Sequence, residues 1–273
     1  MRIDERIADR YTDLSPQERR AADVLLDHLG DLATYRAAEL ADLAGVSKAT
    51  MSRLFRSLGF DDFSEVRDHL RDLRHTGVPL TLDAVPGLSA HVEQEVDNLR
   101  RVFASLEESE LGAIVELLAD AERVVVVGMR SSYPVALHLR QQLAQARPGV
   151  SVAPQPGQSL TEDLVGLGAG DVCVVVGFRR RPDHLADVLV LLEAAGVPVV
   201  LLADATVRAH APHVVHWIEC PLTATSAFDS YAAAMSVVAV LANGVIERRG
   251  RSADQRVAAI ATGYRALREI EEH

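Results

Sequence analysis

Two short segments of this sequence carry side chains suited to binding an anion. One follows the apolar run at 124–127 and the other follows the run at 172–176, and both offer hydroxyl or guanidinium groups that donate hydrogen bonds to phosphate or carboxylate oxygens. The predicted anion-binding residues are Arg130, Ser131, Ser132, Arg179, Arg180 and Arg181. Pro134 suits the first turn of a helix, and the N–H groups at a helix N-terminus also favour an anion. The alternative is that the arginines pair with Asp183, Asp187 or other surface acids.

A third segment, residues 38–54, has the spacing of a helix-turn-helix. Ala41 is small where two helices would cross, and Gly45 can adopt the left-handed conformation that the turn requires. Val46 would enter the core, and Ser47 can cap the second helix. The alternative is a plain helical hairpin with a solvated outer face.

The second helix of this motif concentrates positive charge. Residues 47–58 contain three basic side chains and no acid, although residues 1–75 contain 12 basic and 15 acidic side chains. A recognition helix enters the major groove of DNA, where positive charge is favourable. The predicted DNA-binding residues are Ser47, Lys48, Ala49, Thr50, Ser52, Arg53 and Arg56, and we expect all of them except the capping Ser47 to be exposed on the helix.

Two further patterns imitate functional motifs but favour structural roles. The glycines of segment 166–170 resemble a dinucleotide loop, yet they precede the run 172–176, so their N–H groups cannot line the carboxyl end of that strand. We expect a turn there. Cys173 and Cys220 lie in or beside apolar runs, which is typical of buried thiols rather than nucleophiles.

A group of potential metal ligands lies late in the chain. His210, His213, His216 and Cys220 have spacings that a zinc site could use. However, Pro212 breaks a helix there, and a strand would turn His213 and His216 apart. We therefore expect no metal and no cofactor.

The N-terminal part of the chain must supply the helices that hold the helix-turn-helix. Residues 1–75 are rich in charge, and their apolar positions follow helical spacing. Ser15 is a predicted N-cap, and the helix that it opens is expected to end near Gly30. Glycine and proline punctuate residues 76–89, which we predict to be a linker.

Beyond the linker, residues 90–273 alternate helical and Val-rich segments. The predicted strands are 124–127, 150–153, 172–176, 199–202 and 214–218, and the predicted helical segments are 92–118, 135–145, 185–195 and 231–272. This alternation predicts βαβ crossovers and a parallel sheet. The sequence thus indicates a two-domain protein, α plus α/β: an all-helical domain, then a doubly wound parallel five-stranded sheet.

Composition bounds what such a protein does. The 273 residues are 48% hydrophobic and 25% charged, as in an ordinary globular protein, and no apolar run reaches the length of a membrane span. The net charge of −11 opposes nucleic acid overall, so any DNA binding must be local. Without an export signal, and with two cysteines, the chain is expected in the cytoplasm, away from membranes.

The runs Leu14–Ala22, Ala38–Arg56 and Leu58–Arg67 resemble the N-terminal domain of RpiR/MurR transcription regulators. In that family a DNA-binding domain precedes a sugar isomerase (SIS) domain that senses phosphosugars or related metabolites, and the resemblance extends more weakly over roughly residues 90–265. It implies oligomerisation through an SIS-like domain. The first ligand loop is similar to that of the family, but the second normally carries serines and a glycine where this chain has the arginines of segment 177–182.

These features predict a transcription regulator that is not an enzyme. Its expected partners are double-stranded operator DNA and a small anionic metabolite, a sugar phosphate or carboxylate, whose binding changes the relative placement of two DNA-binding domains in a homodimer or homotetramer. One alternative is a sugar-phosphate isomerase or another enzyme on the SIS fold, with Glu162 or His184 as general base. Another is a scaffold whose second half only dimerises.

Overall fold

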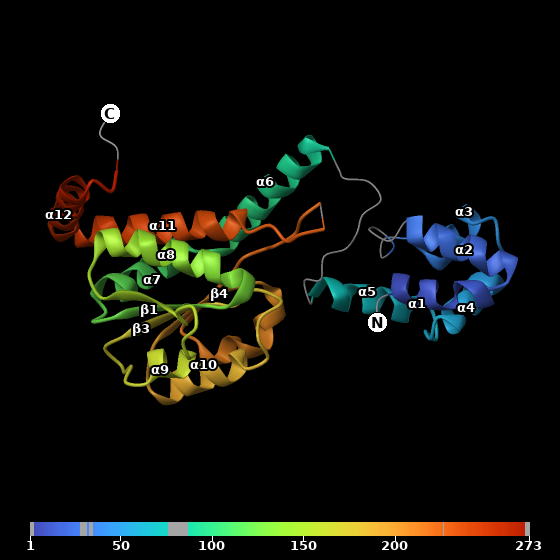
Figure 1. Ribbon diagram of the computed structural model, residues 1–273, viewed down its shortest axis with the longest axis horizontal. Coiled ribbons are helices and arrows are strands. Elements are labelled where there is room, and N and C mark those ends of the chain that lie inside the picture. The colour runs from blue at the N-terminus through green and yellow to red at the C-terminus, as the bar shows by residue number, and fades with distance from the viewer. Residues whose placement is uncertain (1–2, 28–31, 33–34, 76–86, 226, 271–273) are drawn as a thin grey trace. The chain divides into compact units, whose positions relative to one another are not determined.

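The structure is a computed structural model that describes residues 3–27, 32, 35–75, 87–225 and 227–270 (Figure 1). The chain divides into unit 1, Met1–His91 with Ala224–Asp229, and unit 2, Val92–Thr223 with Ser230–His273. The predicted linker at 76–89 lies outside the described residues up to residue 86. Within the described ranges, no helix combines the length and apolar character needed to cross a membrane.

Unit 1 is helical, as the sequence predicts. Its helices are α1 (Ile3–Arg10), α2 (Pro16–Asp27), α3 (Ala37–Leu43), α4 (Lys48–Ser57) and α5 (Phe63–His75), with a short 3-10 helix η1 (Tyr11–Asp13). The Ser15 N-cap is confirmed, because the Ser15 N–H donates to Glu18 Oε2 at 3.0 Å and the Glu18 N–H donates to Ser15 Oγ at 3.4 Å. The predicted end of α2 near Gly30 lies outside the described residues.

Unit 2 contains a parallel sheet of five strands in the order β2-β1-β3-β4-β5. The strands are β1 (Val124–Gly128), β2 (Val150–Ala153), β3 (Val172–Val176), β4 (Val199–Ala203) and β5 (His216–Glu219). The sheet and its parallel pairing are confirmed. β5 starts two residues later than predicted because Val214 ends the 3-10 helix η4 (Ala205–His213), its N–H donating to Ala211 O at 3.2 Å.

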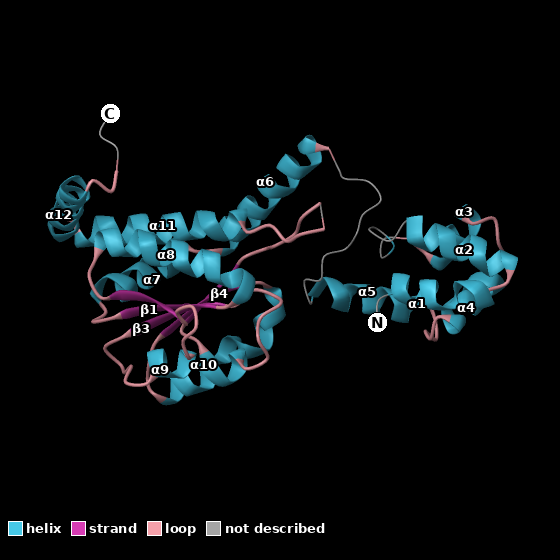
Figure 2. Cartoon of the chain, in the orientation of Figure 1, coloured by secondary structure: helices cyan, strands magenta, loops and turns pink. Residues whose placement is uncertain are grey.

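Helices cover both faces of this sheet (Figure 2). The helices of this part of the chain are α6 (Leu88–Ser105), α7 (Glu108–Asp120), α8 (Tyr133–Ala146), α9 (Leu160–Leu164), α10 (Leu185–Ala194), α11 (Ala232–Arg249) and α12 (Arg251–Leu267), with a 3-10 helix η3 (Arg130–Ser132). The predicted helical segments 92–118 and 231–272 each contain two helices. Extended backbone at Glu107 separates the first pair, and Gly250, at φ +49°, separates the second.

Alternate residues of each central strand enter different cores. Val124 and Val126 pack with α7, α8 and α11, whereas Val125 and Val127 pack with α9 and α10. A strand buried on both faces needs a continuous apolar run, which explains the Val-rich segments in the sequence. Because β1 and β3 are neighbours while β2 lies on the other side of β1, the loops after β1 and β3 flank the point where the chain reverses direction across the sheet. Ligands of doubly wound sheets bind at such a point.

Candidate functional site

The turn between α3 and α4 has the geometry that the sequence predicts. Gly45 has φ +60°, and the Val46 N–H donates to Ala41 O at 3.0 Å. Ser47 Oγ accepts the Thr50 N–H at 3.1 Å, which confirms Ser47 as the N-cap of α4. Ala41 is fully buried, and Val46 packs against the core of unit 1. The two helices are therefore fixed to each other through their shared turn.

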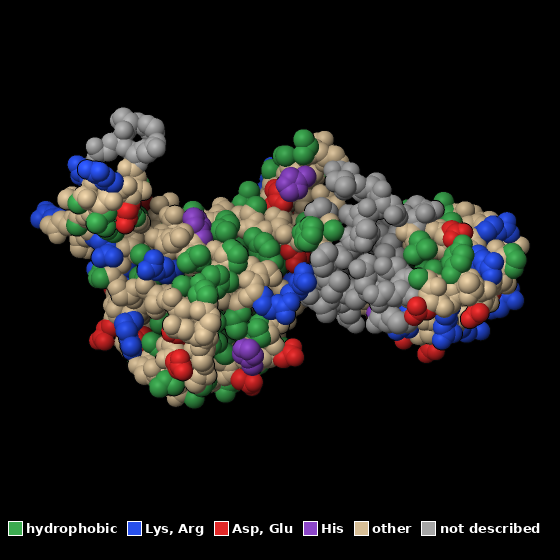
Figure 3. Space-filling view, viewed as in Figure 1, with side chains coloured by type: hydrophobic (Ala, Val, Ile, Leu, Met, Phe, Trp, Pro, Cys, Tyr) green, Lys and Arg blue, Asp and Glu red, His purple; other side chains and the backbone are tan. Residues whose placement is uncertain are grey.

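The outer face of α4 carries most of the predicted DNA-binding residues. Its inner face buries Met51, Leu54 and Phe55 in the core of unit 1. The predicted residues outside that core are Ser47, Lys48, Ala49, Arg53 and Arg56, which are exposed, and Ser52, which is half-buried. Figure 3 shows Lys and Arg side chains gathered over the part of unit 1 that carries α3 and α4.

The expectation that Thr50 is exposed is wrong. Its side chain is only 5% exposed, because its hydroxyl turns back to the start of the helix. Thr50 Oγ1 lies 2.9 Å from Ser47 Oγ and accepts a hydrogen bond from Arg53 Nη2 at 3.3 Å. Thr50 therefore holds the first turn of α4 and orients Arg53.

An acidic side chain near α4 was not foreseen. Glu18 of α2 accepts a hydrogen bond from the Ser15 hydroxyl at 2.6 Å, and this bond is the main cause of a lowered pKa for the Glu18 carboxyl. The positive charge of Arg53 lowers that pKa further. Arg53 thus has a carboxylate in its neighbourhood, and DNA phosphates would compete with that carboxylate for its charge.

The loops after β1 and β3 are joined by a side chain from the first. Ser132 is buried, and its Oγ accepts the Phe178 N–H at 3.1 Å. At the end of β1, a Cβ on Gly128 would lie 2.5 Å from Ala136 Cβ and 2.9 Å from Ser132 O. The loop after β1 therefore folds tightly onto the start of α8, and only glycine fits where it begins.

Two of the predicted arginines have a strained backbone. Arg130 in the first loop has φ +55° and Arg180 in the second has φ +68°, and both side chains are exposed. Among the described residues, Arg268 is the one other non-glycine residue with positive φ. Such a conformation costs of order 1–3 kcal/mol and persists where the surrounding structure imposes it, often at ligand-binding sites. Ser131, beside Arg130, is half-buried.

The other two predicted arginines bind the protein itself. Arg181 donates from Nη1 to Gly177 O at 3.1 Å and from Nη2 to Thr206 O at 2.9 Å, and burial lowers the pKa of its guanidinium. Arg179 donates from Nη2 to Leu222 O at 3.3 Å. The predicted set thus separates into two arginines that bind backbone carbonyls of neighbouring loops and two that are presented to solvent.

Asp204 is a residue of this site that sequence reasoning missed. It is 6% exposed and follows β4 directly. Its carboxylate accepts the Arg179 N–H at 2.5 Å, the Thr206 N–H at 2.8 Å and the Thr206 hydroxyl. The signal was present, since a polar residue within three positions after a Val-rich run pointed to the other two loops as well.

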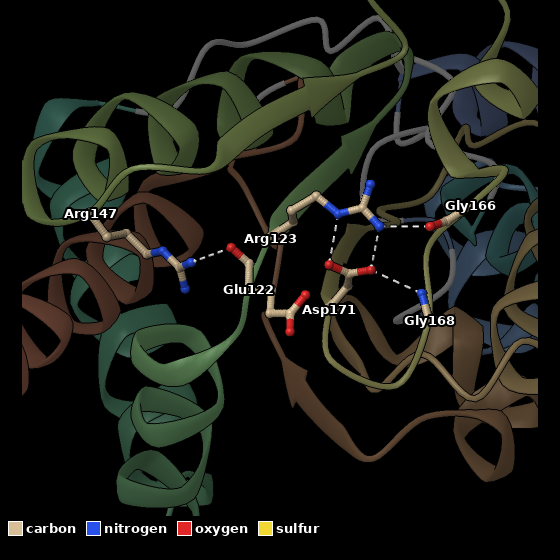
Figure 4. Close-up of polar contacts among 6 residues, drawn as sticks. All are labelled: Glu122, Arg123, Arg147, Gly166, Gly168 and Asp171. Carbon is tan, nitrogen blue, oxygen red and sulfur yellow. Dashed lines mark hydrogen bonds and ion pairs between the residues drawn. The ribbon is translucent and has the colours of Figure 1, made fainter.

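The glycines of segment 166–170 form a turn before β3, at the amino ends of the strands and away from the loops after β1 and β3 (Figure 4). Arg123 donates to both carboxylate oxygens of Asp171, at 2.8 and 2.6 Å, and to Gly166 O at 2.6 Å. Asp171 Oδ2 also accepts the Gly168 N–H at 2.9 Å. The ion pair between Arg123 and Asp171 therefore stabilises this turn. Because the Gly168 N–H is already bonded to Asp171, the turn does not have the form of a phosphate-binding loop.

The structure also shows the surroundings of the histidines and cysteines that the sequence offers as metal ligands or nucleophiles. His213 Nδ1 lies 2.7 Å from Glu193 Oε2 and His216 Nδ1 lies 3.4 Å from Glu110 Oε1, so the two rings contact different elements. No group of three potential metal-ligating side chains occurs among the residues that the structure describes. Both cysteines are buried, and burial raises the pKa of each thiol to about 12.

Comparison with known proteins agrees with this architecture. The family model of the rpiR helix-turn-helix domain matches residues 1–74, and that of the SIS domain matches residues 117–244. The chain is 26% identical over 260 residues to the HTH-type transcriptional regulator HexR of Pseudomonas aeruginosa, covering 90% of each chain. It is 26% identical over 268 residues to HexR of Escherichia coli, covering 92% of this chain and 90% of that relative.

Solved structures share the fold. The sugar isomerase domain of the RpiR transcription factor from Sphaerobacter thermophilus has a TM-score of 0.60 at 23% identity, covering 64% of this chain and 98% of its own. The NanR protein of Vibrio vulnificus, complexed with ManNAc-6P, has a TM-score of 0.57 at 21% identity, covering 97% and 98%. Fold and domains define a helix-turn-helix transcription regulator with an SIS domain. The chain belongs to the RpiR family of such regulators.

Proposed function

We propose that this regulator binds operator DNA through α4 and is controlled by a small anionic metabolite, a sugar phosphate or a carboxylate, held between the loops after β1 and β3. The observation that carries the effector proposal is the pair Arg130 and Arg180. Both side chains are exposed and extend from strained backbone on the loops that follow the neighbouring strands β1 and β3, and an anion would relieve the repulsion between two like charges brought together there. Ser131 and the start of α8 add hydrogen-bond donors.

The other arginines have a different role in this proposal. Arg179 and Arg181 hold the loop in shape through backbone carbonyls, and Asp204 fixes the Arg179 N–H. They are positioning residues, and Arg130 and Arg180 bind the ligand. ManNAc-6P in the NanR complex is an anionic sugar of the proposed class, but at 21% identity that likeness supports the fold and not the ligand.

For the DNA contact, we propose Lys48, Arg53 and Arg56 as the charged contacts and Ser47, Ala49 and Ser52 as the smaller ones. One short recognition helix makes few base contacts, so the operator has two half-sites and the protein binds it as a symmetric oligomer, a homodimer or homotetramer. We propose no catalytic activity. Guanidinium groups stay protonated, so Arg130 and Arg180 cannot act as general bases.

A thermal-unfolding titration tests the effector site. The probes are a sugar phosphate panel and the same sugars without phosphate. An anion at a hundredfold excess over its dissociation constant would stabilise the native state by about 2.7 kcal/mol. Arg130→Ala and Arg180→Gly should abolish this stabilisation, and the glycine relieves the strain at position 180. Arg251→Ala, at an exposed arginine of α12, should retain it.

Two results would reject the effector proposal: equal stabilisation by the neutral sugars, or an unchanged response in both loop variants. Turnover of any of the sugar phosphates would instead support the isomerase alternative.

A further inference from the structure

A hollow of about 330 Å³ in unit 1 adjoins the outer face of α4. It lies between the residue that precedes α3, the middle of α4 and the start of α5. Its lining combines two guanidinium groups and two hydroxyl groups with one carboxylate. These polar lining residues are Arg36, Ser52, Asp62, Ser64 and Arg67. Guanidinium and hydroxyl groups together are the donors that proteins use to bind phosphate oxygens.

The floor of the hollow is apolar and holds one of the two arginines. Phe55 of α4 and Phe63 of α5 are buried, and their ring centroids lie 5.3 Å apart. Cζ of Arg67 lies 5.5 Å from the centroid of the Phe63 ring, and Arg67 Nη2 donates to Ser64 Oγ at a long 3.4 Å. Among the described residues, Arg67 Nε has no hydrogen-bond partner. The protein thus fixes this cation over an aromatic ring but uses little of its hydrogen-bonding capacity.

The carboxylate in the lining is committed to the fold. Asp62 Oδ1 accepts the Ser64 N–H at 2.7 Å and the Glu65 N–H at 3.1 Å, so Asp62 caps the first turn of α5. An anion in the hollow would therefore be held by side chains rather than by these N–H groups. Two guanidinium groups and one carboxylate leave the lining net positive, although residues 1–75 contain more acidic than basic side chains.

The hollow lies at one edge of the face of α4 that we assign to DNA. At 3.6 residues per turn, Ser52 stands about 40° from Lys48 and about 60° from Phe55 around the helix axis. Arg53 stands about 160° from Phe55, at the opposite edge of that face. A helix with its side chains is about 10–12 Å wide and the major groove is about 12 Å wide, so a helix in the groove has a phosphate strand along each edge. One of these strands would pass the hollow.

We infer that this hollow binds a phosphate of the DNA backbone beside the major groove that α4 enters. Arg36 and Arg67 supply the positive charge, and the hydroxyl groups of Ser52 and Ser64 supply further donors. Such a contact fixes the position of α4 on the duplex and carries no base preference. The inference rests on the proposed function, because it requires α4 in the groove, and it extends the DNA interface to the starts of α3 and α5.

Removal of the two positive charges tests this contact. Arg36→Gln and Arg67→Gln should each weaken binding to every duplex by about 5-fold to 10-fold, since a phosphate contact does not depend on sequence. The double variant should lower the slope of log affinity against log salt by about 1 for each hollow that holds a phosphate. Arg20→Gln, at an exposed arginine of α2, should change neither quantity. Fluorescence anisotropy of the full chain with a labelled duplex of mixed sequence measures both.

Ser64→Asp tests the same contact without removing an arginine. The added carboxylate would pair with Arg67, three residues later on α5, and should weaken DNA binding by at least about 10-fold. An acid in the first turn of α5 favours the helix, so the unfolding temperature should equal or exceed that of wild type. Ser252→Asp makes the same change at the exposed second residue of α12 and should leave DNA binding within about twofold of wild type.

The outcomes separate this inference from the proposed function. If both glutamine variants bind DNA like Arg20→Gln while wild-type binding weakens with salt, the hollow is no phosphate contact and the proposed function stands. A loss confined to some sequences would make these residues base contacts and overturn the inference. Thermal stabilisation by inorganic phosphate that the double variant lacks, with DNA binding unchanged, would assign the hollow to a free anion instead. A wild type that binds no DNA would overturn both.

Discussion

The buried carboxylate of Asp204 accepts the backbone N–H of Arg179 at 2.5 Å, which joins the loop after β4 to the loop after β3. The same carboxylate caps η4 through the Thr206 N–H. On the other side, Ser132 of the loop after β1 accepts the Phe178 N–H. Hydrogen bonds thus connect the loops that follow three neighbouring strands, β1, β3 and β4. These loops lie at the carboxyl ends of the strands, where we place the effector.

Asp204→Asn should lower the free energy of unfolding by about 1–3 kcal/mol, because the amide nitrogen would face an N–H donor that the carboxylate now satisfies. Chemical denaturation measures the change. Asp183→Asn, at an exposed acid of the adjoining loop, should stay within about 0.5 kcal/mol of wild type. Equal effects from the two substitutions would contradict the role of Asp204.

Gly128→Ala should destabilise the protein by about 1–3 kcal/mol through overpacking, since the added Cβ has no room between Ala136 and Ser132. The variant should also lose any stabilisation by the effector, because the loop with Arg130 would shift. Gly168→Ala is the matched control, as a Cβ there meets no atom within 4 Å. If Gly128→Ala unfolds like wild type in denaturant, the tight loop geometry is wrong.

The ion pair between Arg123 and Asp171 should make stability depend on pH. The Arg123 hydrogen bond is the main cause that lowers the pKa of the Asp171 carboxyl in the native state. A lowered native pKa adds stability above the unfolded pKa and loses it as the pH falls through the native value. The difference in unfolding free energy between wild type and Arg123→Ala should therefore be constant above about pH 5 and shrink below about pH 4.

Denaturant unfolding of both proteins between pH 3 and pH 7 measures this difference. If the difference in unfolding free energy stays constant or increases as the pH falls, Asp171 does not titrate with a lowered pKa.

Local sequence chemistry was enough to predict most of the fold. The Val-rich runs are continuous because each central strand is buried on both faces, and the turn at Gly45 and the cap at Ser47 depend on neighbours in the chain. Thr50 was misplaced because its spacing is compatible with either side of α4. Its return to Ser47 depends on the geometry of the first turn.

The sequence alone could not distinguish the roles of the arginines in the loop after β3. Arg179, Arg180 and Arg181 are identical in type and adjacent, and which guanidinium meets a carbonyl depends on loops that come much later in the chain. Thr206 and Leu222 supply two of these carbonyls, and Gly177 of the same loop supplies a third. The positive φ at Arg180 is likewise a result of how the loop closes rather than of its residue type.

Lys48→Ala should weaken DNA binding similarly for all sequences and reduce the slope of log affinity against log salt by about 1, if Lys48 holds a phosphate. Fluorescence anisotropy with a labelled duplex over a range of salt concentrations measures the slope. Arg20→Ala, at an exposed arginine of α2, should leave it unchanged. A flat salt response of the wild-type protein would point to a partner other than DNA.

Selection of duplexes from a random pool tests the central claim most directly, with wild-type protein and Arg53→Ala compared side by side. We predict that wild type enriches a symmetric sequence with two half-sites. Arg53→Ala should bind that sequence about 1–3 kcal/mol more weakly and lose preference at one position of each half-site, if Arg53 reaches a guanine edge. Enrichment of no sequence by wild type, or an identical enriched sequence and affinity for Arg53→Ala with its fold intact, would contradict the assignment of α4 as the DNA-reading helix.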